Sequence, residues 1–228
     1  MRIFLVISGV LFSTTVLAQT YTTQSQKFSY TLGYQVAKNV QREGAAFDVE
    51  AFIQGVRDVA ANTELKLTQA EMQQAITEHQ NVKAAAQKEM MKQRQAMGQT
   101  NLEQGKQFLE ANKAKEGVKV TASGLQYKEI TPGTGNQPAA TDTVEVNYRG
   151  TLLNGKQFDS SYDRGQSITF KLDGVIKGWQ EALQLMKEGA KWQVFIPAEL
   201  AYGATGAGAM IGPNETLIFD IELIAVKK

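Results

Sequence analysis

The chain has 228 residues, with 24 basic and 23 acidic side chains, one histidine (His79) and no cysteine. This length allows one or two domains, and the lack of cysteine excludes disulfides, thiolate metal sites and cysteine nucleophiles. One histidine leaves no multi-histidine metal site, and a formal charge of +1 gives no electrostatic reason to expect nucleic acid as the main partner. We therefore expect any reaction to need neither a metal nor a cofactor.

Residues 1–18 have the pattern of a secretory signal peptide. Arg2 supplies a positive start, residues 3–12 are apolar, and a Val-Leu-Ala sequence ending at Ala18 predicts cleavage after that residue. The apolar run is too short to span a membrane, and an uncleaved anchor is the alternative. We expect an exported protein, located in the periplasm, at the outer membrane or outside the cell.

The first half of the chain is predicted to be helical, because residues 19–115 contain no proline and few glycines. Apolar residues at a four-residue spacing predict a helix over 24–42, which ends at Gly44. Asp48 can cap a second helix over 49–61 through its side-chain oxygen.

Two short amphipathic helices cannot bury a core by themselves. We therefore expect them to pair with a second copy of the chain, so that residues 19–66 form a helical dimerisation domain, with neighbouring residues up to about 75 contributing. The alternative is that these helices fold back onto the second half of the same chain.

A third, much longer helix is predicted to connect the two halves. The sequence Thr-Gln-Ala-Glu at 68–71 is a capping box that opens this helix, and no breaker follows before its end, so we predict a connector over 67–115. Most side chains over 83–101 are polar, which is typical of a helix exposed to solvent. Gly98 is the expected position of a bend, since glycine weakens a helix.

The second half is predicted to be an α+β domain, with an antiparallel sheet packed on one short helix over 178–186. Asn154-Gly155 predicts a tight hairpin turn. The strands are predicted over 124–130, 143–152, 167–172, 191–196 and 216–226.

Five motifs of the second half resemble those of the FKBP-type peptidyl-prolyl cis-trans isomerases. They are V-N-Y-R-G-T-L from Val146, N-G-K-Q-F-D-S-S from Asn154, V-I-K-G-W from Val175, A-Y-G from Ala201 and T-L-I-F from Thr216. Their order and spacing follow the family, which implies an FKBP-like isomerase domain over 119–228. Residues 19–118 resemble the helical dimerisation domain of the macrophage infectivity potentiator subgroup, which implies a dimer whose long helices separate two isomerase domains.

The implied activity agrees with the composition. An X-Pro bond rotates over a barrier of about 18–20 kcal/mol, because resonance gives its C–N bond partial double-bond character. Rotation needs no reactive group, since a dry pocket that binds the twisted, less conjugated amide more tightly than the planar one accelerates it. The expected partners are proline-containing unfolded or partly folded polypeptides, and inhibitors of the tacrolimus and rapamycin class. A dimeric holdase chaperone is the alternative from another class, and the two functions can coexist.

The resemblance also implies the site residues. Trp179 would be the pocket floor on which the proline ring rests, and Asp159 would polarise or orient the bound amide. Arg164 would fix Asp159 in place. The expected catalytic residues are Asp159, Tyr202, Tyr148 and Phe158, and the expected substrate- and inhibitor-binding residues are Val175, Ile176, Trp179, Phe219, Ile168, Met210, Ile211 and Arg164.

Two further expectations concern the edges of this pocket. The backbone N–H of Ile176 and the hydroxyl of Tyr202 would donate hydrogen bonds to substrate carbonyls, while Met210 and Ile211 would close the pocket from above. The Gly/Ala-rich segment 204–210 is expected to be a mobile flap.

Some positions depart from the family pattern. Ile168 replaces a usual pocket phenylalanine, Ala207 replaces a histidine or bulkier residue, and the segment 171–174 is about two residues shorter. We expect these changes to alter ligand affinity rather than the reaction. Two other interpretations are remote: the glycines over 203–208 lack the Gly-Lys-Ser/Thr of a phosphate loop, and two aspartates four apart in one loop make a poor glycosidase pair.

Overall fold

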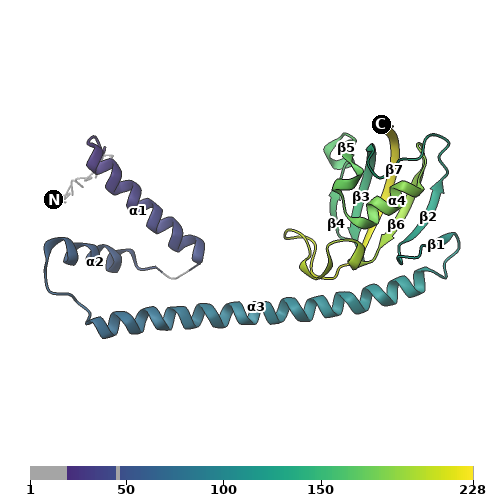
Figure 1. The fold of residues 1–228 in the computed structure, drawn as a ribbon. Helices are drawn as coiled ribbons and strands as arrows, with labels where there is room; N and C mark the ends of the chain where they lie inside the picture. The colour runs from purple at the N-terminus through teal and green to yellow at the C-terminus, as the bar shows by residue number, and fades with distance from the viewer. Residues whose placement is uncertain (1–19, 45–46, 228) are drawn as a thin grey trace, which may run out of the picture. The chain divides into compact units, whose positions relative to one another are not determined.

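The computed structural model describes residues 20–44 and 47–227 (Figure 1). The predicted signal peptide and its cleavage site after Ala18 lie outside the described residues. The chain divides into two compact units, Met1–Ile76 and Thr77–Lys228, and each is described by itself. No helix in the described ranges is long and apolar enough to cross a membrane.

The first unit contains the two short helices that the sequence predicts. Helix α1 (Gln24–Glu43) begins at a capping box and ends at Gly44, whose positive φ of 67° is the left-handed conformation that glycine adopts readily. Helix α2 (Val49–Ala61) begins at Asp48, whose carboxylate accepts a hydrogen bond of 3.0 Å from the backbone N–H of Ala51.

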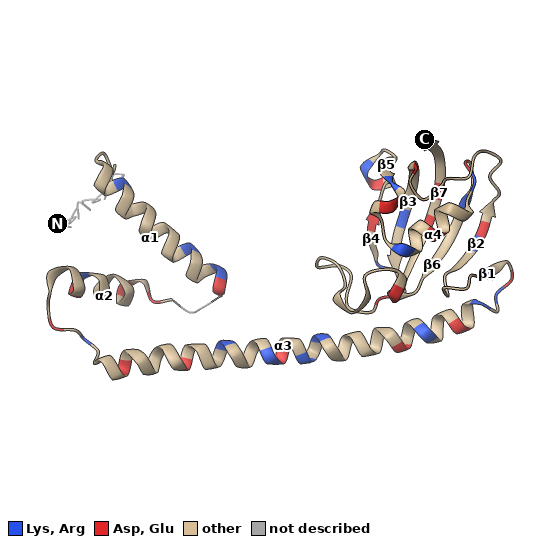
Figure 2. Ribbon diagram, in the orientation of Figure 1, with Lys and Arg blue, Asp and Glu red and all other residues tan. Residues whose placement is uncertain are grey.

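Helix α3 (Gln69–Asn112) is the predicted connector, and it begins at the predicted capping box. The Thr68 hydroxyl accepts from the Glu71 backbone N–H at 3.2 Å, and the Glu71 carboxylate accepts from the Thr68 backbone N–H at 2.7 Å. Its side chains are exposed from Lys83 to Met97, and Figure 2 shows charges of both signs spread along it. Gly98 lies within the continuous helix and is buried, and the bend expected there stays a prediction.

The second unit is an antiparallel sheet with one helix packed against it, as predicted (Figure 1). Its strand order is β1-β2-β6-β7-β3-β4, and β5 also pairs with β3. Helix α4 spans Lys177–Leu185. The strands are β1 (Val118–Val120), β2 (Gln126–Thr131), β3 (Thr143–Leu152), β4 (Gln157–Ser160), β5 (Ile168–Lys171), β6 (Lys191–Ile196) and β7 (Leu217–Lys227).

The core lies between α4 and the sheet. The face of α4 that the sequence places inward is buried, and alternate residues of the two long strands β3 and β7 meet it. These buried residues are Trp179, Ala182, Leu183 and Met186 next to or on α4, Val144, Val146 and Tyr148 on β3, and Leu217, Phe219, Ile221 and Leu223 on β7. The short edge strands β1 and β4 were not predicted, because three or four residues carry too little alternation to be recognised.

The last turns of α3 belong to this unit and are packed on it. Phe108 contacts Phe195 of β6, with ring centroids 5.8 Å apart. The buried Asn112 amide donates to the Gln126 side chain at 3.0 Å, and Gln126 donates back to the Leu109 carbonyl at 2.8 Å. The predicted connector is therefore exposed to solvent over 83–97, while its last turns are packed against the sheet.

Candidate active site

A cavity of about 360 Å³ opens in the second unit between α4, the strands β3 to β5 and the start of the loop after β6. Its volume is within the range of small-molecule sites, and its lining is mainly aromatic and aliphatic. A larger groove of about 970 Å³ runs along the exposed part of α3, but alanine, lysine and glutamine line most of it. The cavity is lined by Tyr148, Phe158, Asp159, Ile168, Phe170, Gly174, Val175, Ile176, Trp179, Tyr202 and Phe219.

The aromatic rings of the cavity hold one another edge to face. Trp179 forms T-shaped contacts with Tyr148 and with Phe219, both at a centroid distance of 5.1 Å. Phe158 meets Phe219 in the same way at 5.4 Å, and Phe170 lies 5.5 Å from Trp179. Because edge-to-face pairs are favourable and each ring restrains its neighbours, the apolar lining is preorganised.

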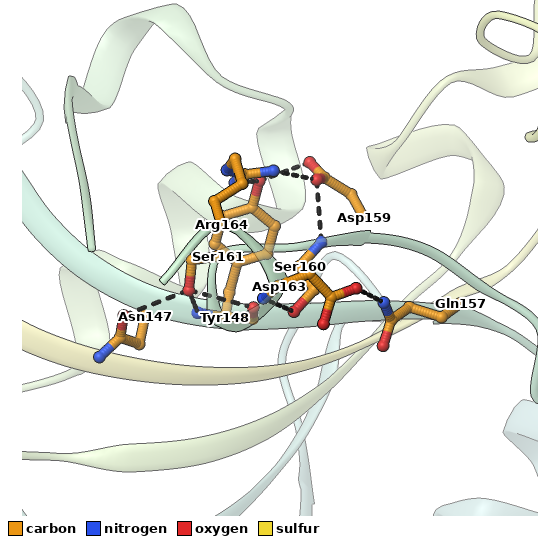
Figure 3. Close-up of polar contacts among 8 residues, drawn as sticks. All are labelled: Asn147, Tyr148, Gln157, Asp159, Ser160, Ser161, Asp163 and Arg164. Carbon is orange, nitrogen blue, oxygen red and sulfur yellow. Dashed lines mark hydrogen bonds and ion pairs between the residues drawn. The ribbon is translucent and has the colours of Figure 1, made fainter. Parts of the chain in front are cut away.

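One charged cluster stands at the edge of this apolar lining (Figure 3). The Tyr148 hydroxyl donates a hydrogen bond to the Asp159 carboxylate. Arg164 donates to the other Asp159 oxygen at 2.5 Å and to the Tyr148 hydroxyl at 2.8 Å. Tyr148 lies on β3, Asp159 on β4 and Arg164 at the end of the short 3-10 turn Tyr162–Arg164. This turn follows β4 and reverses the chain, so that Arg164 faces Asp159.

Two serines fix the backbone of this cluster. The Ser160 backbone N–H donates to Asp159 at 2.8 Å, and the fully buried Ser161 hydroxyl accepts from the Tyr148 backbone N–H at 2.9 Å (Figure 3). Ser160 thus holds the Asp159 carboxylate through its backbone N–H, and the Ser161 side chain joins the end of β4 to Tyr148 of β3.

The cluster fixes the protonation of its members. Burial opposes the charged form of Asp159, but hydrogen bonds from Tyr148 and Arg164 outweigh it and hold the pKa of this carboxyl below its usual range. Burial, followed by the hydrogen bond to Asp159, raises the pKa of the Tyr148 hydroxyl. At neutral pH the cluster therefore contains a carboxylate, a guanidinium and a neutral phenol that donates.

Comparison with known proteins assigns the chain that forms this site to a family. The model of the FKBP-type peptidyl-prolyl cis-trans isomerase matches residues 134–224, and the model of the domain amino terminal to FKBP-type peptidyl-prolyl isomerase matches residues 25–128. The chain belongs to the FKBP-type peptidyl-prolyl cis-trans isomerases. It is an enzyme of the isomerase class, as the sequence predicted.

Relatives extend the match over almost the whole isomerase. The peptidyl-prolyl cis-trans isomerase Mip of Coxiella burnetii is 46% identical, over 96% of this chain and 95% of the relative. The outer membrane protein MIP of Legionella longbeachae is 42% identical, over 97% of this chain and 95% of its own length. The crystal structure of FkpA from Escherichia coli has a TM-score of 0.65 at 38% identity, covering 91% of this chain and 99% of that one.

The structure of the isomerase brings most of the predicted site residues to one cavity. Met210 and Ile211 are not among the described residues that line it. A bridge between Ala207 and Ile211 folds the loop on itself, which places the Ile211 side chain in the core while Met210 is 41% exposed. Arg164 lies outside the lining and donates hydrogen bonds to Asp159 and Tyr148, which belong to it.

Sequence reasoning missed three residues of this site. Phe170 and Gly174 line the cavity, and the alternation along β5 places Phe170 on the same face as Ile168, which was a usable signal. Gly150 on β3 stands opposite Asp159 of β4 and Phe219 of β7 in the sheet register. A Cβ at Gly150 would lie 2.6 Å from the Phe158 ring and 2.7 Å from the Phe219 ring, so only glycine leaves room for both.

The Gly/Ala-rich loop after Tyr202 is folded rather than extended. It begins with the 3-10 turn Gly203–Thr205, and the Asn214 backbone N–H donates to the Gly203 carbonyl at 2.8 Å, which closes the loop at its base. The mobility expected for residues 204–210 stays a prediction.

Proposed function

We propose that the aromatic cavity binds the proline of an X-Pro segment and accelerates rotation about its amide bond by desolvation. The observation that carries this is the placement of one fixed ionic cluster at the edge of an otherwise apolar, ring-lined cavity. An amide that twists loses resonance, and its carbonyl oxygen loses negative charge, so an apolar surrounding favours the twisted state over the planar one.

The geometry supports a role for each contact. Trp179 is 5% exposed and centres the ring contacts, which suits the floor beneath a proline ring. Ile176 is the N-cap residue of α4, where the first backbone N–H groups have no partner within the helix, so its N–H can donate to a substrate carbonyl. The Tyr202 ring lines the cavity, and burial, followed by the charge of Asp159, raises the pKa of its hydroxyl, which therefore stays a donor.

A peptide isomerisation assay on the full chain tests this proposal. Tyr202→Phe removes only the hydroxyl, and we expect kcat/KM to fall by about tenfold, which corresponds to about 1.4 kcal/mol of transition-state stabilisation. Tyr162→Phe is the matched control, because the Tyr162 hydroxyl donates to Glu222 on the sheet surface instead. Equal rates for wild type and Tyr202→Phe would remove Tyr202 from the mechanism.

We further propose that the isomerase is a homodimer through its first unit, residues 19–66 and the start of α3. In the described part of α1 no residue is buried, and Phe28 is 66% exposed. On α2, Val56 and Val59 are 54% and 74% exposed. Apolar surface at this density on small helices favours burial against a second copy.

This apolar first unit also favours a second candidate function, which is capture of unfolded chains. Two linked isomerase sites raise the effective concentration of a client at each of them. The variant Asp159→Asn, for which we expect a strongly reduced isomerase rate, separates the roles: suppression of client aggregation at the wild-type level supports an independent chaperone, and a loss of suppression in step with the rate refutes one.

The remaining partners and the location complete the proposal. The cavity suits macrolides of the tacrolimus and rapamycin class, and titration of Trp179 fluorescence in a Trp192→Phe background tests their binding, since the chain contains only these two tryptophans. We place the mature chain, from Gln19 onward, outside the cytoplasm; the similarity to a protein named outer membrane protein MIP supports this, and mass spectrometry of the secreted form gives the cleavage site.

A further inference from the structure

The loop that follows Tyr202 in the isomerase is held at both ends by α3. At its start, the Arg94 guanidinium donates to the Thr205 carbonyl. At its end, the Asn101 amide donates to the Pro213 carbonyl at 2.9 Å, and the Asn214 amide donates in the opposite direction to the Gly98 carbonyl at 3.1 Å. Three side-chain bonds thus join one face of a helix to the two ends of one loop.

Two glycines allow the helix to come this close. A Cβ at Gly98 would lie 3.1 Å from the Pro213 ring, which is tighter than ordinary packing, and Gly98 is buried. About two turns further on, a Cβ at Gly105 would collide with the Thr216 hydroxyl. Glycine in a helix interior lowers stability by about 1 kcal/mol relative to alanine. At Gly98 and Gly105 this loss is offset, because the missing Cβ lets the helix pack closely against the loop.

The contacting residues of α3 form one face of the helix. Arg94, Gly98, Asn101 and Gly105 are spaced by four, three and four residues, which is the repeat of a single helical stripe. Asn214, which this stripe contacts, has a φ of 55°, a conformation that asparagine tolerates better than most residues. Its side-chain bond to Gly98 helps to hold that conformation, and its backbone N–H closes the loop onto Gly203, the residue next to Tyr202.

We propose that Arg94 and Asn101 on α3 are positioning residues for the isomerase reaction, because they hold the loop whose base sets the place of Tyr202 at the cavity. The connector helix is then a working part of the active site and not only a spacer. This inference rests on the role of Tyr202 in the proposed function. Neither residue lines the cavity, so both act through the loop.

Asn101→Asp in the full chain is the first test. It keeps the size of the side chain but removes the N–H donor to Pro213, and a carboxylate facing a carbonyl pushes the loop away. We expect kcat/KM to fall by about threefold to tenfold, because small displacements of a positioning group are costly in rate. Arg94→Ala is a second variant, and it removes the hydrogen-bond donor to the Thr205 carbonyl. Because the Arg94 side chain is exposed, this substitution should not prevent the chain from folding.

A double-variant cycle separates positioning from general stability. If Asn101 acts through Tyr202, then Asn101→Asp has little further effect on kcat/KM in a Tyr202→Phe background, whereas independent effects would multiply. Asn81→Asp is the matched control on the exposed part of α3, and it should leave kcat/KM unchanged.

Three outcomes would overturn the inference. Unchanged kcat/KM in both Asn101→Asp and Arg94→Ala would show that α3 does not position the loop. Multiplicative effects with Tyr202→Phe would show that Asn101 does not act through Tyr202. A full rate for Tyr202→Phe alone would show that the proposed role of Tyr202 is wrong, and the positioning role would fail with it.

Discussion

The Tyr148 hydroxyl donates a hydrogen bond to the Asp159 carboxylate, and this bond places a charge at the edge of an aromatic cavity. The second carboxylate oxygen accepts from Arg164 and from the Ser160 backbone N–H. With both oxygens occupied inside the protein, Asp159 is poorly placed to transfer a proton. In the proposed mechanism Asp159 acts through its charge and by fixing Tyr148, which agrees with a reaction that moves no proton.

The first prediction concerns that charge. Asp159→Asn keeps the shape of the side chain but removes its charge and leaves the Arg164 guanidinium without its ion pair. We expect kcat/KM in a peptide isomerisation assay to fall by about tenfold or more, which corresponds to at least about 1.4 kcal/mol. The Asp159 side chain is 43% exposed, so the free energy of unfolding should change by less than about 1 kcal/mol.

Asp163→Asn is the control for that experiment. Asp163 lies four residues further along, in the turn that carries Arg164, and it accepts a hydrogen bond from Gln157 rather than from the cavity cluster. We expect an unchanged rate. Equal losses in the two variants would mean that the turn as a whole matters, and not the carboxylate at the cavity.

The second prediction concerns the pKa of Asp159. Its folded value is depressed, so it contributes stability that is present above the unfolded pKa of about 3.9 and is lost as the pH falls through the folded value. Tyr148→Phe removes one of the three hydrogen bonds, from Tyr148, Arg164 and the Ser160 backbone N–H, that oppose the effect of burial, so the pKa of Asp159 should rise. Carbon-13 NMR titration of the Asp159 carboxyl measures this midpoint directly. An unmoved midpoint would show that the Tyr148 bond does not set the pKa and that Arg164 and the Ser160 N–H suffice, and Tyr162→Phe should leave the midpoint unmoved as a control.

The sequence predicted the elements whose signals are local. Helix starts are predicted at Asp48 and at the capping box of Thr68 and Glu71, and the structure confirms both positions. Strand β6 has the predicted bounds, and β3 does as well, because ten alternating residues define a strand with one buried face.

What the sequence could not supply depends on contacts between distant residues. Propensity describes Gly98 only as a weak point of a helix and predicts a bend there; its close approach to Pro213, more than a hundred residues away in the chain, could not be predicted. The Ala207–Ile211 bridge, which makes Ile211 part of the buried core cluster, also could not be predicted from the sequence, and the role of Ile211 at the cavity stays a prediction. Gly150 belongs to a motif that resembles the family, but its place between the Phe158 and Phe219 rings depends on the sheet register and could not be predicted from the sequence.

The third prediction concerns the first unit. Phe28→Lys places a charge on the apolar face of α1, where burial against a second copy would leave that charge without water. Sedimentation equilibrium at micromolar concentration should give the mass of one chain for this variant and of two chains for wild type. Gln41→Lys, an exposed polar position on the same helix, is the control and should remain a dimer. A wild-type mass of one chain would refute the dimer.

The last prediction concerns Gly150, which the sheet places between the two phenylalanines of the cavity wall. Gly150→Ala adds a methyl group that both rings would have to give way to, and overpacking of this kind costs about 1–3 kcal/mol in a well-packed core. Because Phe158 and Phe219 line the cavity, we expect kcat/KM to fall together with the free energy of unfolding.

A second substitution shows whether that loss comes from the rings. Phe158→Leu removes ring atoms that the new methyl group would meet, so the double variant Gly150→Ala, Phe158→Leu should be more stable than the sum of the two single losses predicts. Gly55→Ala, at a helical position where a Cβ meets nothing within 4 Å, should leave the rate unchanged. Strictly additive losses in the double variant would mean that Gly150 serves the strand and not the cavity wall.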